Sequence, residues 1–410
     1  MEIRPIFSAM LKNRTGPLLV AVQVALSLAI LANALFVVQQ RMALADRPSG
    51  VADERNVGSV FVRPLRQLSH PEVLAEQKRE EAVLRGLAGV QSVTWVSQMP
   101  LSRSGSSGGV RGTATQTRES AVPSQYFVHS GFISTLGLRL VEGRDFTDAD
   151  VVEFNPDKEG DVTPPGVIVT EALARALFPN ESRFVGRTFY FGMNGEQPTR
   201  VIGVIERLQT TAAQPGEPGE QSVLMPFDIS MPFSRFAIRA EPGQLDRVLK
   251  EAADTLRKTA SVPMRTSARS LLEDRVSRYK NEKALAWMLI SVSALLLLVT
   301  VSGIVGMTML RVAQRRKQIG VRRALGARWR DILRYFVTEN IIITTGGIVA
   351  GLVLALALNR MLIAYLGLPR LPLEYLAVGA GALWMLGVVA VYGPAARAAG
   401  ISPAIATRTA

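Results

Sequence analysis

Four long apolar runs, very unequally spaced, constrain this chain more than any other feature. They are Pro17–Val38, Ala284–Leu310, Ile341–Leu358 and Tyr375–Ala396, and none contains Asp, Glu, Lys or Arg. Each is close to the 17–25 residues that a helix needs to cross a hydrocarbon core. A polar segment, residues 41–283, separates the first run from the second. The sequence therefore predicts four transmembrane helices with one large extramembrane domain between the first two.

The first run has a second interpretation as a cleaved signal peptide. Basic residues precede it, and Ala43-Leu44-Ala45 has the small residues of a cleavage site. However, the apolar run is longer than the 7–15 residues of a signal-peptide core. We interpret it as an uncleaved anchor. Cysteine is absent from the sequence, so no disulfide framework is available to the extramembrane domain.

The net charge of +13 suggests a nucleic-acid partner until the charges are located. Segment 41–283 is nearly neutral, with 31 Lys and Arg against 30 Asp and Glu. The excess lies before the first run, between the second and third runs, and after the fourth. Short loops rich in Lys and Arg stay in the cytoplasm. The charges therefore predict a multi-pass protein of the bacterial inner membrane, with both termini cytoplasmic and no nucleic-acid partner.

Together, hydropathy and charge predict an α+β membrane protein whose four transmembrane helices carry a large two-part periplasmic domain. Apolar residues at positions 3, 6, 7, 10 and 11 also predict a helix at the membrane interface. The predicted segments are a cytoplasmic interfacial helix at 1–16, transmembrane helix 1 at 17–40, the periplasmic domain at 41–283, helix 2 at 284–310, a cytoplasmic coupling loop at 311–334, helix 3 at 335–360, a periplasmic loop at 361–372, helix 4 at 373–396 and a cytoplasmic tail at 397–410.

The periplasmic domain alternates strand and helix patterns. Expected strands are Val57–Val62, Val90–Val96, Gln125–His129, Gly166–Thr170, Thr188–Phe191, Thr199–Ile205, Ser222–Met225, Arg235–Arg239 and Pro263–Thr266. Expected helices are Pro71–Leu87, Glu171–Phe178 and Gln244–Thr259, with a helical turn at Gly131–Leu136. This order predicts a discontinuous subdomain, about 56–121 and 221–269, with a second subdomain inserted at about 122–220.

Segment Ser270–Lys283 is amphipathic and enters the second apolar run without Pro or Gly. A single rigid helix linking the domain to the membrane is the prediction, and a flexible junction is the alternative.

Three segments together resemble the MacB-like, or FtsX-like, family of ABC transporter permeases. The loop sequence Arg315-Arg316-Lys317-Gln318-Ile319-Gly320-Val321-Arg322-Arg323-Ala324-Leu325-Gly326-Ala327 is similar to that family's basic, E-I-G, basic, A-L-G-A signature. Segments 137–146, 167–179, 185–186 and 200–204 resemble its periplasmic core, and 394–399 followed by 402–404 resembles its tail. Two positions depart from the pattern. Gln318 replaces the usual Glu, and Arg183-Phe184 stands where the family has Asp-Pro, so the contacts and turn at these positions differ from the family's.

The resemblance implies that a cytoplasmic ABC ATPase dimer acts on two permease chains, identical or different. The sequence contains no phosphate-binding G-x-x-x-x-G-K-[ST] loop. We therefore expect this chain to bind no cofactor, and ATP and Mg²⁺ to be held by the partner ATPase. The expected contact with that ATPase is a short helix from Gln314 to Leu325. Its predicted coupling residues are Arg315, Arg316, Lys317, Ile319, Gly320, Arg322, Arg323, Leu325 and Arg328.

In the docking interpretation, Arg322, Arg323 and Arg328 meet carboxylates of the ATPase, while Ile319, Val321 and Leu325 fill a groove. In the alternative, the arginines only fix topology or bind anionic lipid head groups. Glu339 is an intramembrane polar candidate, because an ionisable residue a few positions inside a span is costly and often functional. Its alternative placement is at the membrane interface.

The expected function is export of an antibiotic, peptide or similar compound, with a periplasmic adaptor and outer-membrane channel as further partners. Lipoprotein release and regulation of a cell-wall hydrolase are the alternatives within the family. A periplasmic enzyme is the alternative from another class, but the sequence has only two histidines, His70 and His129, and no G-x-S-x-G or H-E-x-x-H motif. No catalytic or metal-binding residue is therefore predicted.

Overall fold

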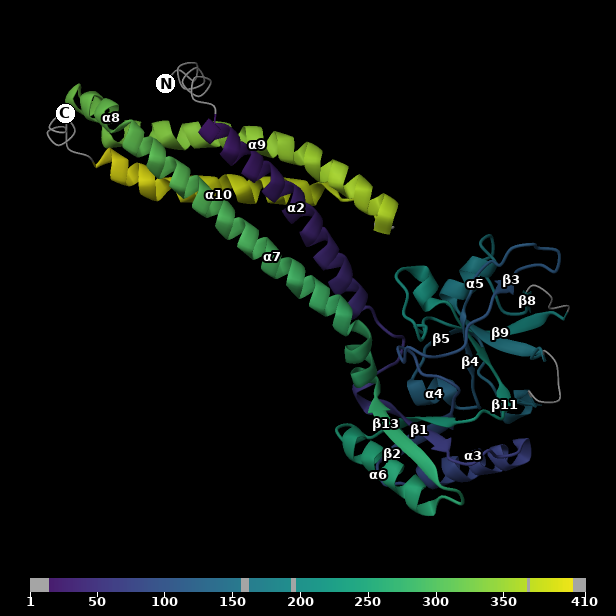
Figure 1. The fold of residues 1–410 in the computed structure, drawn as a ribbon. Coiled ribbons are helices and arrows are strands. Elements are labelled where there is room, and N and C mark those ends of the chain that lie inside the picture. Colours follow the sequence, from purple (N-terminus) through teal and green to yellow (C-terminus); the bar gives the residue numbers. More distant parts are fainter. Residues whose placement is uncertain (1–14, 156–161, 193–196, 367–368, 401–410) are drawn as a thin grey trace. The chain divides into compact units, whose positions relative to one another are not determined.

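The computed structural model describes residues 15–155, 162–192, 197–366 and 369–400 (Figure 1). The predicted interfacial helix and most of the predicted tail, including Ser402-Pro403-Ala404, lie outside the described residues. The chain divides into two compact units. Leu44–Lys280 forms the extramembrane domain, and the residues on either side of it form the helical unit.

The first sheet of the extramembrane domain has the order β13-β1-β12-β2, with every pair antiparallel. Its elements are β1 (Val57–Pro64), α3 (His70–Arg85), β2 (Val90–Trp95), β12 (Ser234–Ala240), α6 (Leu245–Thr259) and β13 (Met264–Ser270). This β-α-β-β-α-β order is that of the ferredoxin-like fold, interrupted between β2 and β12 by the rest of the domain. The α3 helix begins at a capping box formed by Ser69 and Glu72.

A second sheet has the order β3-β8-β9-β7-β10-β4, with β5 also paired to β9. Its strands are β3 (Val110–Arg111), β4 (Ser124–Phe127), β5 (Leu140–Gly143), β7 (Gly166–Thr170), β8 (Thr188–Phe191), β9 (Thr199–Ile205) and β10 (Ser222–Met225). The accompanying helices are α4 (Phe132–Leu136) and α5 (Glu171–Leu177). The short strands β6 (Val152–Phe154) and β11 (Phe227–Ile229) pair in parallel.

The strand pairing places the border between the two subdomains at other residues than the sequence predicts. Both β3 and β10 belong to the second sheet, whereas the predicted ranges 56–121 and 221–269 assign them to the first subdomain. The inserted part is therefore longer than 122–220. The physical reason is that β10 pairs with β4 in parallel and with β7 antiparallel, and such distant hydrogen bonds leave no local pattern in the sequence.

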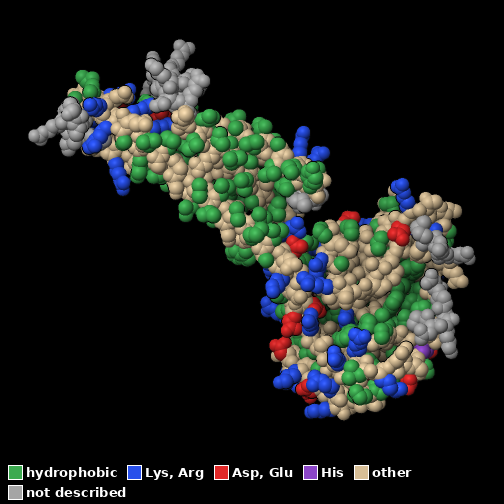
Figure 2. All heavy atoms as spheres, viewed as in Figure 1, with side chains coloured by type: hydrophobic (Ala, Val, Ile, Leu, Met, Phe, Trp, Pro, Cys, Tyr) green, Lys and Arg blue, Asp and Glu red, His purple; other side chains and the backbone are tan. Residues whose placement is uncertain are grey.

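Among the described residues, four helices are long and apolar enough to cross a membrane: α2 (Thr15–Asp46), α7 (Leu271–Gln314), α9 (Trp329–Leu366) and α10 (Leu373–Ala399). Each contains one of the apolar runs. In Figure 2, hydrophobic side chains cover the visible surface of these helices. Several apolar side chains of these helices, including Trp287, Leu298 and Met385, have about two thirds of their surface accessible and are suited to face lipid. The α7 helix is unbroken from Leu271, as the pattern from Ser270 to Lys283 predicts.

Polar side chains and glycines fasten α2 to its neighbours in the helical unit. Ser27 Oγ lies 2.7 Å from Thr300 Oγ1 of α7, and Asn33 Nδ2 donates to the Ala355 carbonyl of α9 at 3.1 Å. A Cβ added at Gly347 or Gly351 of α9 would lie within 3 Å of a backbone carbonyl oxygen of α2. Glycine at these positions therefore permits close helix contact.

Candidate functional site

The segment between α7 and α9 forms a short helix, α8 (Arg316–Ala324), followed by a tight turn. The turn has hydrogen bonds from Gly326 N to Arg323 O and from Ala327 N to Arg322 O, at 3.1 and 3.0 Å. Gly326 adopts a φ of 95°, a left-handed conformation that favours glycine. The Arg328 amide then donates to the Asp331 carboxylate and caps the start of α9. These caps fix where α8 ends and α9 begins.

One face of α8 and its turn presents apolar and basic side chains to the exterior. Val321 and Leu325, one helical turn apart, are 52% and 83% exposed. Arg316, Lys317 and Arg328, three of the predicted coupling residues, are exposed beside them. An exposed leucine flanked by cations is suited to contact an acidic partner with an apolar groove.

The other predicted coupling residues contact the helical unit itself. Ile319 and Gly320 are buried, so the Ile319 side chain is not available to fill a groove of a partner. Arg323 Nη1 donates to the Ala399 carbonyl at the end of α10 at 2.6 Å. Arg322 lies over the ring of Tyr335 on α9, with its Cζ 5.3 Å from the ring centroid. Arg323 therefore fastens α8 to the end of α10, whereas Arg322 is exposed as well as lying over Tyr335.

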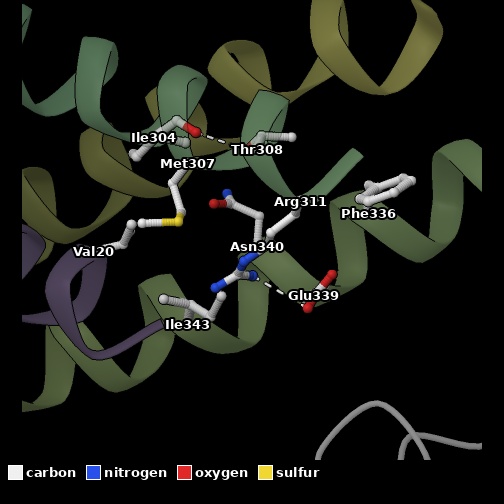
Figure 3. A pocket seen from close by; sticks show the side chains of 9 residues that line it. All are labelled: Val20, Ile304, Met307, Thr308, Arg311, Phe336, Glu339, Asn340 and Ile343. Atoms are coloured by element: carbon white, nitrogen blue, oxygen red, sulfur yellow. Dashed lines mark hydrogen bonds and ion pairs between the residues drawn. The ribbon is translucent and has the colours of Figure 1, made fainter. Parts of the chain in front are cut away.

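Glu339 lies in α9 within a buried charge cluster (Figure 3). Its side chain is 3% exposed, and its two oxygens lie 3.2 Å from Arg311 Nη1 and 3.5 Å from Arg315 Nη1. Both arginines lie at the end of α7, one helical turn apart. The structure thus places Glu339 inside the helical unit rather than at its surface, because two guanidinium groups offset the cost of its burial.

Tyr335 connects this cluster to α8. Its hydroxyl accepts a hydrogen bond of 2.5 Å from Arg315 Nη1, and the guanidiniums of Arg315 and Arg322 both lie within 6 Å of its ring centroid. Tyr335 stands one helical turn before Glu339 on α9. Its contacts therefore join the end of α7, the helix α8 and the beginning of α9. Tyr335 is absent from the residues predicted from the sequence, although its spacing of four residues from Glu339 is a signal that was available.

The two histidines lie in the extramembrane domain and have different partners. His70 Nδ1 is 2.8 Å from Ser230 Oγ and its Nε2 is 3.1 Å from Glu153 Oε1. In the Ser-His-Asp arrangement the acid is buried and holds Nδ1, whereas Glu153 is 66% exposed and holds Nε2. This trio does not define a hydrolase site.

His129 stacks on Trp95 of β2, with ring centroids 4.9 Å apart. Its ring nitrogens lie 3.6 Å from Glu81 and 3.5 Å from Asp228. These partners raise the pKa of His129 against the opposing effect of burial. Since Trp95 and Glu81 belong to the first sheet layer and Asp228 to β11, this cluster joins the two parts of the domain.

Two family models match the chain. The MacB-like periplasmic core domain matches residues 23–256, and the FtsX-like permease C-terminal domain matches residues 290–403. Helices that can span a membrane, an α+β domain between the first two of them along the chain, and these matches define a permease of the ABC transporter class. The chain belongs to the MacB-like and FtsX-like family of ABC transporter permeases.

Similar curated proteins differ in how much of their length the chain covers. The macrolide export ATP-binding/permease protein MacB of Bradyrhizobium diazoefficiens is 28% identical over 58% of this chain, which covers 37% of that protein. The uncharacterized ABC transporter permease YknZ of Bacillus subtilis is 25% identical over 83% of this chain and 81% of its own length. The chain therefore spans most of YknZ but about a third of MacB.

Solved structures of similar proteins cover the extramembrane region. The extracellular domain of YknZ from Gram-positive bacteria matches 51% of this chain and 99% of that chain, at 18% identity and a TM-score of 0.33. The periplasmic region of MacB from Actinobacillus actinomycetemcomitans matches 57% and 96%, at 17% identity and a TM-score of 0.34. The family assignment rests on the family models.

Proposed function

We propose that this chain is the permease subunit through which a separate cytoplasmic ATPase moves a periplasmic domain, driving export of an antibiotic, peptide or similar compound. In this proposal ATP and Mg²⁺ are bound by the ATPase dimer, and a second permease chain, identical or different, completes the complex. The chain itself performs no catalysis. An adaptor and an outer-membrane channel would carry the compound onward.

The observation that supports docking is the exposed face of α8, where Val321 and Leu325 lie beside three basic residues. Burying Leu325 in an apolar groove would contribute free energy in proportion to its exposed area. Movement of α8 would then reach α7 through the contacts of Tyr335, Arg315 and Glu339. The two groups of residues therefore have different roles, because the exposed face binds the ATPase and the buried cluster transmits its movement.

The docking variant that the structure favours is Leu325→Asp, because Leu325 is largely exposed and the variant spares Arg322 and Arg323. We expect this variant to bind the ATPase at least roughly thirtyfold more weakly, as for a hot-spot residue worth about 2 kcal/mol. The measurement is the amount of ATPase that co-purifies with the full chain from native membranes in mild detergent.

The matched control is Leu65→Asp, which places the same charge at a 61% exposed leucine of the extramembrane domain. It should leave co-purification unchanged. Normal ATPase recovery with Leu325→Asp would remove the docking proposal. Recovery of lipoproteins in place of an adaptor would still support an ATPase-driven permease, but its cargo would then be lipoproteins.

A further inference from the structure

The charge cluster around Glu339 opens into a cavity of about 290 Å³ within the helical unit. Three elements line it: the first turn of α2, the end of α7 with Arg315, and α9. Its lining residues are Thr15, Gly16, Pro17, Leu19, Met307, Leu310, Arg311, Gln314, Arg315 and Glu339. A much smaller void of about 10 Å³ lies next to it and shares Arg311, Glu339 and Met307 (Figure 3).

Charges in this cavity do not balance. Arg311 and Arg315 supply two cations and Glu339 supplies one anion, and no other lining residue is charged. Arg311 is nearly buried, with 13% of its side chain exposed. Among the described residues, its Nη2 atom has no hydrogen-bond partner. A buried guanidinium without a full set of acceptors is costly, so the site favours an additional anion.

The apolar part of the lining indicates which anion fits. Leu19 and Leu310 belong to charge-free apolar runs and are 63% and 52% exposed, so they form a rim on the surface that faces lipid. A soluble anion would gain nothing from this rim. A molecule with an anionic head and acyl chains would place the head at the arginines and its chains along the leucines.

We propose that this cavity binds the phosphodiester headgroup of an anionic phospholipid, with Arg311 and Arg315 contacting the phosphate and Leu19 and Leu310 contacting the acyl chains. Glu339 offsets one of the two guanidinium charges and so limits the positive charge of the site. Gly16 keeps the entrance open, because a Cβ there would lie 2.9 Å from Met307 Sδ and 3.6 Å from Arg311 Nη2. The lining residues of the cavity are different from the exposed α8 residues that we assign to ATPase docking.

The test is native mass spectrometry of the full chain in detergent, titrated with phosphatidylglycerol or with phosphatidylcholine of the same acyl chains. Both lipids carry the phosphodiester, but only the first keeps a net negative charge. We expect phosphatidylglycerol to bind at least about fivefold more tightly, which is roughly 1 kcal/mol in total and matches the one net positive charge of the site. Equal binding of the two lipids would overturn the proposal.

Two substitutions should change the lipid preference of the cavity in opposite directions. Arg315→Gln should abolish the preference for phosphatidylglycerol, whereas Glu339→Gln, which removes the competing carboxylate, should strengthen it. The matched control is Arg334→Gln, which removes an exposed positive charge from the same end of α9 and should change nothing. If Arg315→Gln does not fold, the Glu339→Gln result alone decides, because unchanged or weaker binding contradicts the charge argument.

A third arm separates the two sources of phosphate. An excess of inorganic phosphate should displace little phosphatidylglycerol, because it lacks the acyl chains that contact Leu19 and Leu310. Complete displacement would assign the cavity to a soluble phosphate and overturn the lipid proposal. None of these outcomes depends on recovery of an ATPase.

Discussion

At the scale of single residues, burial decides the role of each charge. Glu339 and Glu80 are both buried, and Glu339 lies within 4 Å of two arginine side chains. Glu80, on α3, has one oxygen without a hydrogen-bond partner among the described residues. Burial raises the pKa of Glu80 to about 7; the carboxylate of Glu76 adds to this effect and Arg79 opposes it. Glu80 is therefore a carboxyl group that the folded domain favours in its neutral form.

The sign of the resulting pH dependence follows from linkage. The folded state binds the Glu80 proton more tightly than the unfolded chain, so its contribution to stability is fully present below pH 4.5 and is lost as the pH rises through 7. Glu80→Gln removes this loss. At pH 8 we expect the variant to raise the free energy of local unfolding by roughly 3 kcal/mol, and at pH 4 to change it little.

Hydrogen exchange of α3 amides in the full chain measures this difference at the two pH values. Glu251→Gln, at a half-exposed position on α6, is the matched control and should stay within about 0.5 kcal/mol at both. An equal shift of protection at pH 4 and pH 8 would contradict the assignment.

At the scale of elements, the glycines of the helical unit differ in whether a neighbouring helix lies against them. The third and fourth apolar runs contain Gly346, Gly347, Gly351, Gly379, Gly381 and Gly387, and small residues of this kind can permit close helix contacts. A Cβ at Gly347, Gly351, Gly379 or Gly387 would meet a neighbouring helix at 3.0 Å or less, whereas one at Gly346 or Gly381 would meet nothing within 4 Å. Periodicity alone did not distinguish these two groups.

Adjacent glycines provide the test. In Gly347→Ala the new Cβ would lie 2.7 Å from the Ala21 carbonyl oxygen, so α2 and α9 must separate, and we expect a loss of about 1–3 kcal/mol of stability. Gly346→Ala has open space and gains helix propensity, so it should be neutral or stabilising by up to about 1 kcal/mol. The thermal midpoint of each purified variant in detergent measures the difference. Equal midpoints would mean that α2 and α9 are not in close contact.

At the scale of the whole molecule, α7 is the element that belongs to both units. It begins directly after β13, and Tyr279 in its first part is buried and donates a hydrogen bond to Gln209 at 3.1 Å within the extramembrane domain. Its last part carries Arg311 of the charge cluster. One continuous helix of 44 residues is therefore the covalent path by which force on α8 would reach the domain.

A Gly-Gly-Ser insertion between Lys283 and Ala284 tests this path. We expect ATP hydrolysis by the complex to persist while export falls to the level of a complex that cannot hydrolyse ATP, because the flexible segment no longer transmits force. The same insertion between Pro242 and Gly243, in an exposed turn of the domain, is the control and should retain export. Unchanged efflux-dependent resistance with the α7 insertion would refute the rigid-helix mechanism.

The sequence by itself determined the four apolar helices, the position of the α+β domain between them and most of its strands, because hydrophobic periodicity and turn residues act over a few neighbouring positions. It also identified the basic segment around α8 and the unusual position of Glu339. Only the tertiary structure decided that Ile319 is buried, that Arg323 bonds to the end of α10, and that β3 and β10 join the second sheet. These outcomes depend on which residues, distant in sequence, come into contact in the folded chain. A buried charge or backbone group that lacks a partner is costly, so the folded structure selects the arrangement that pairs them.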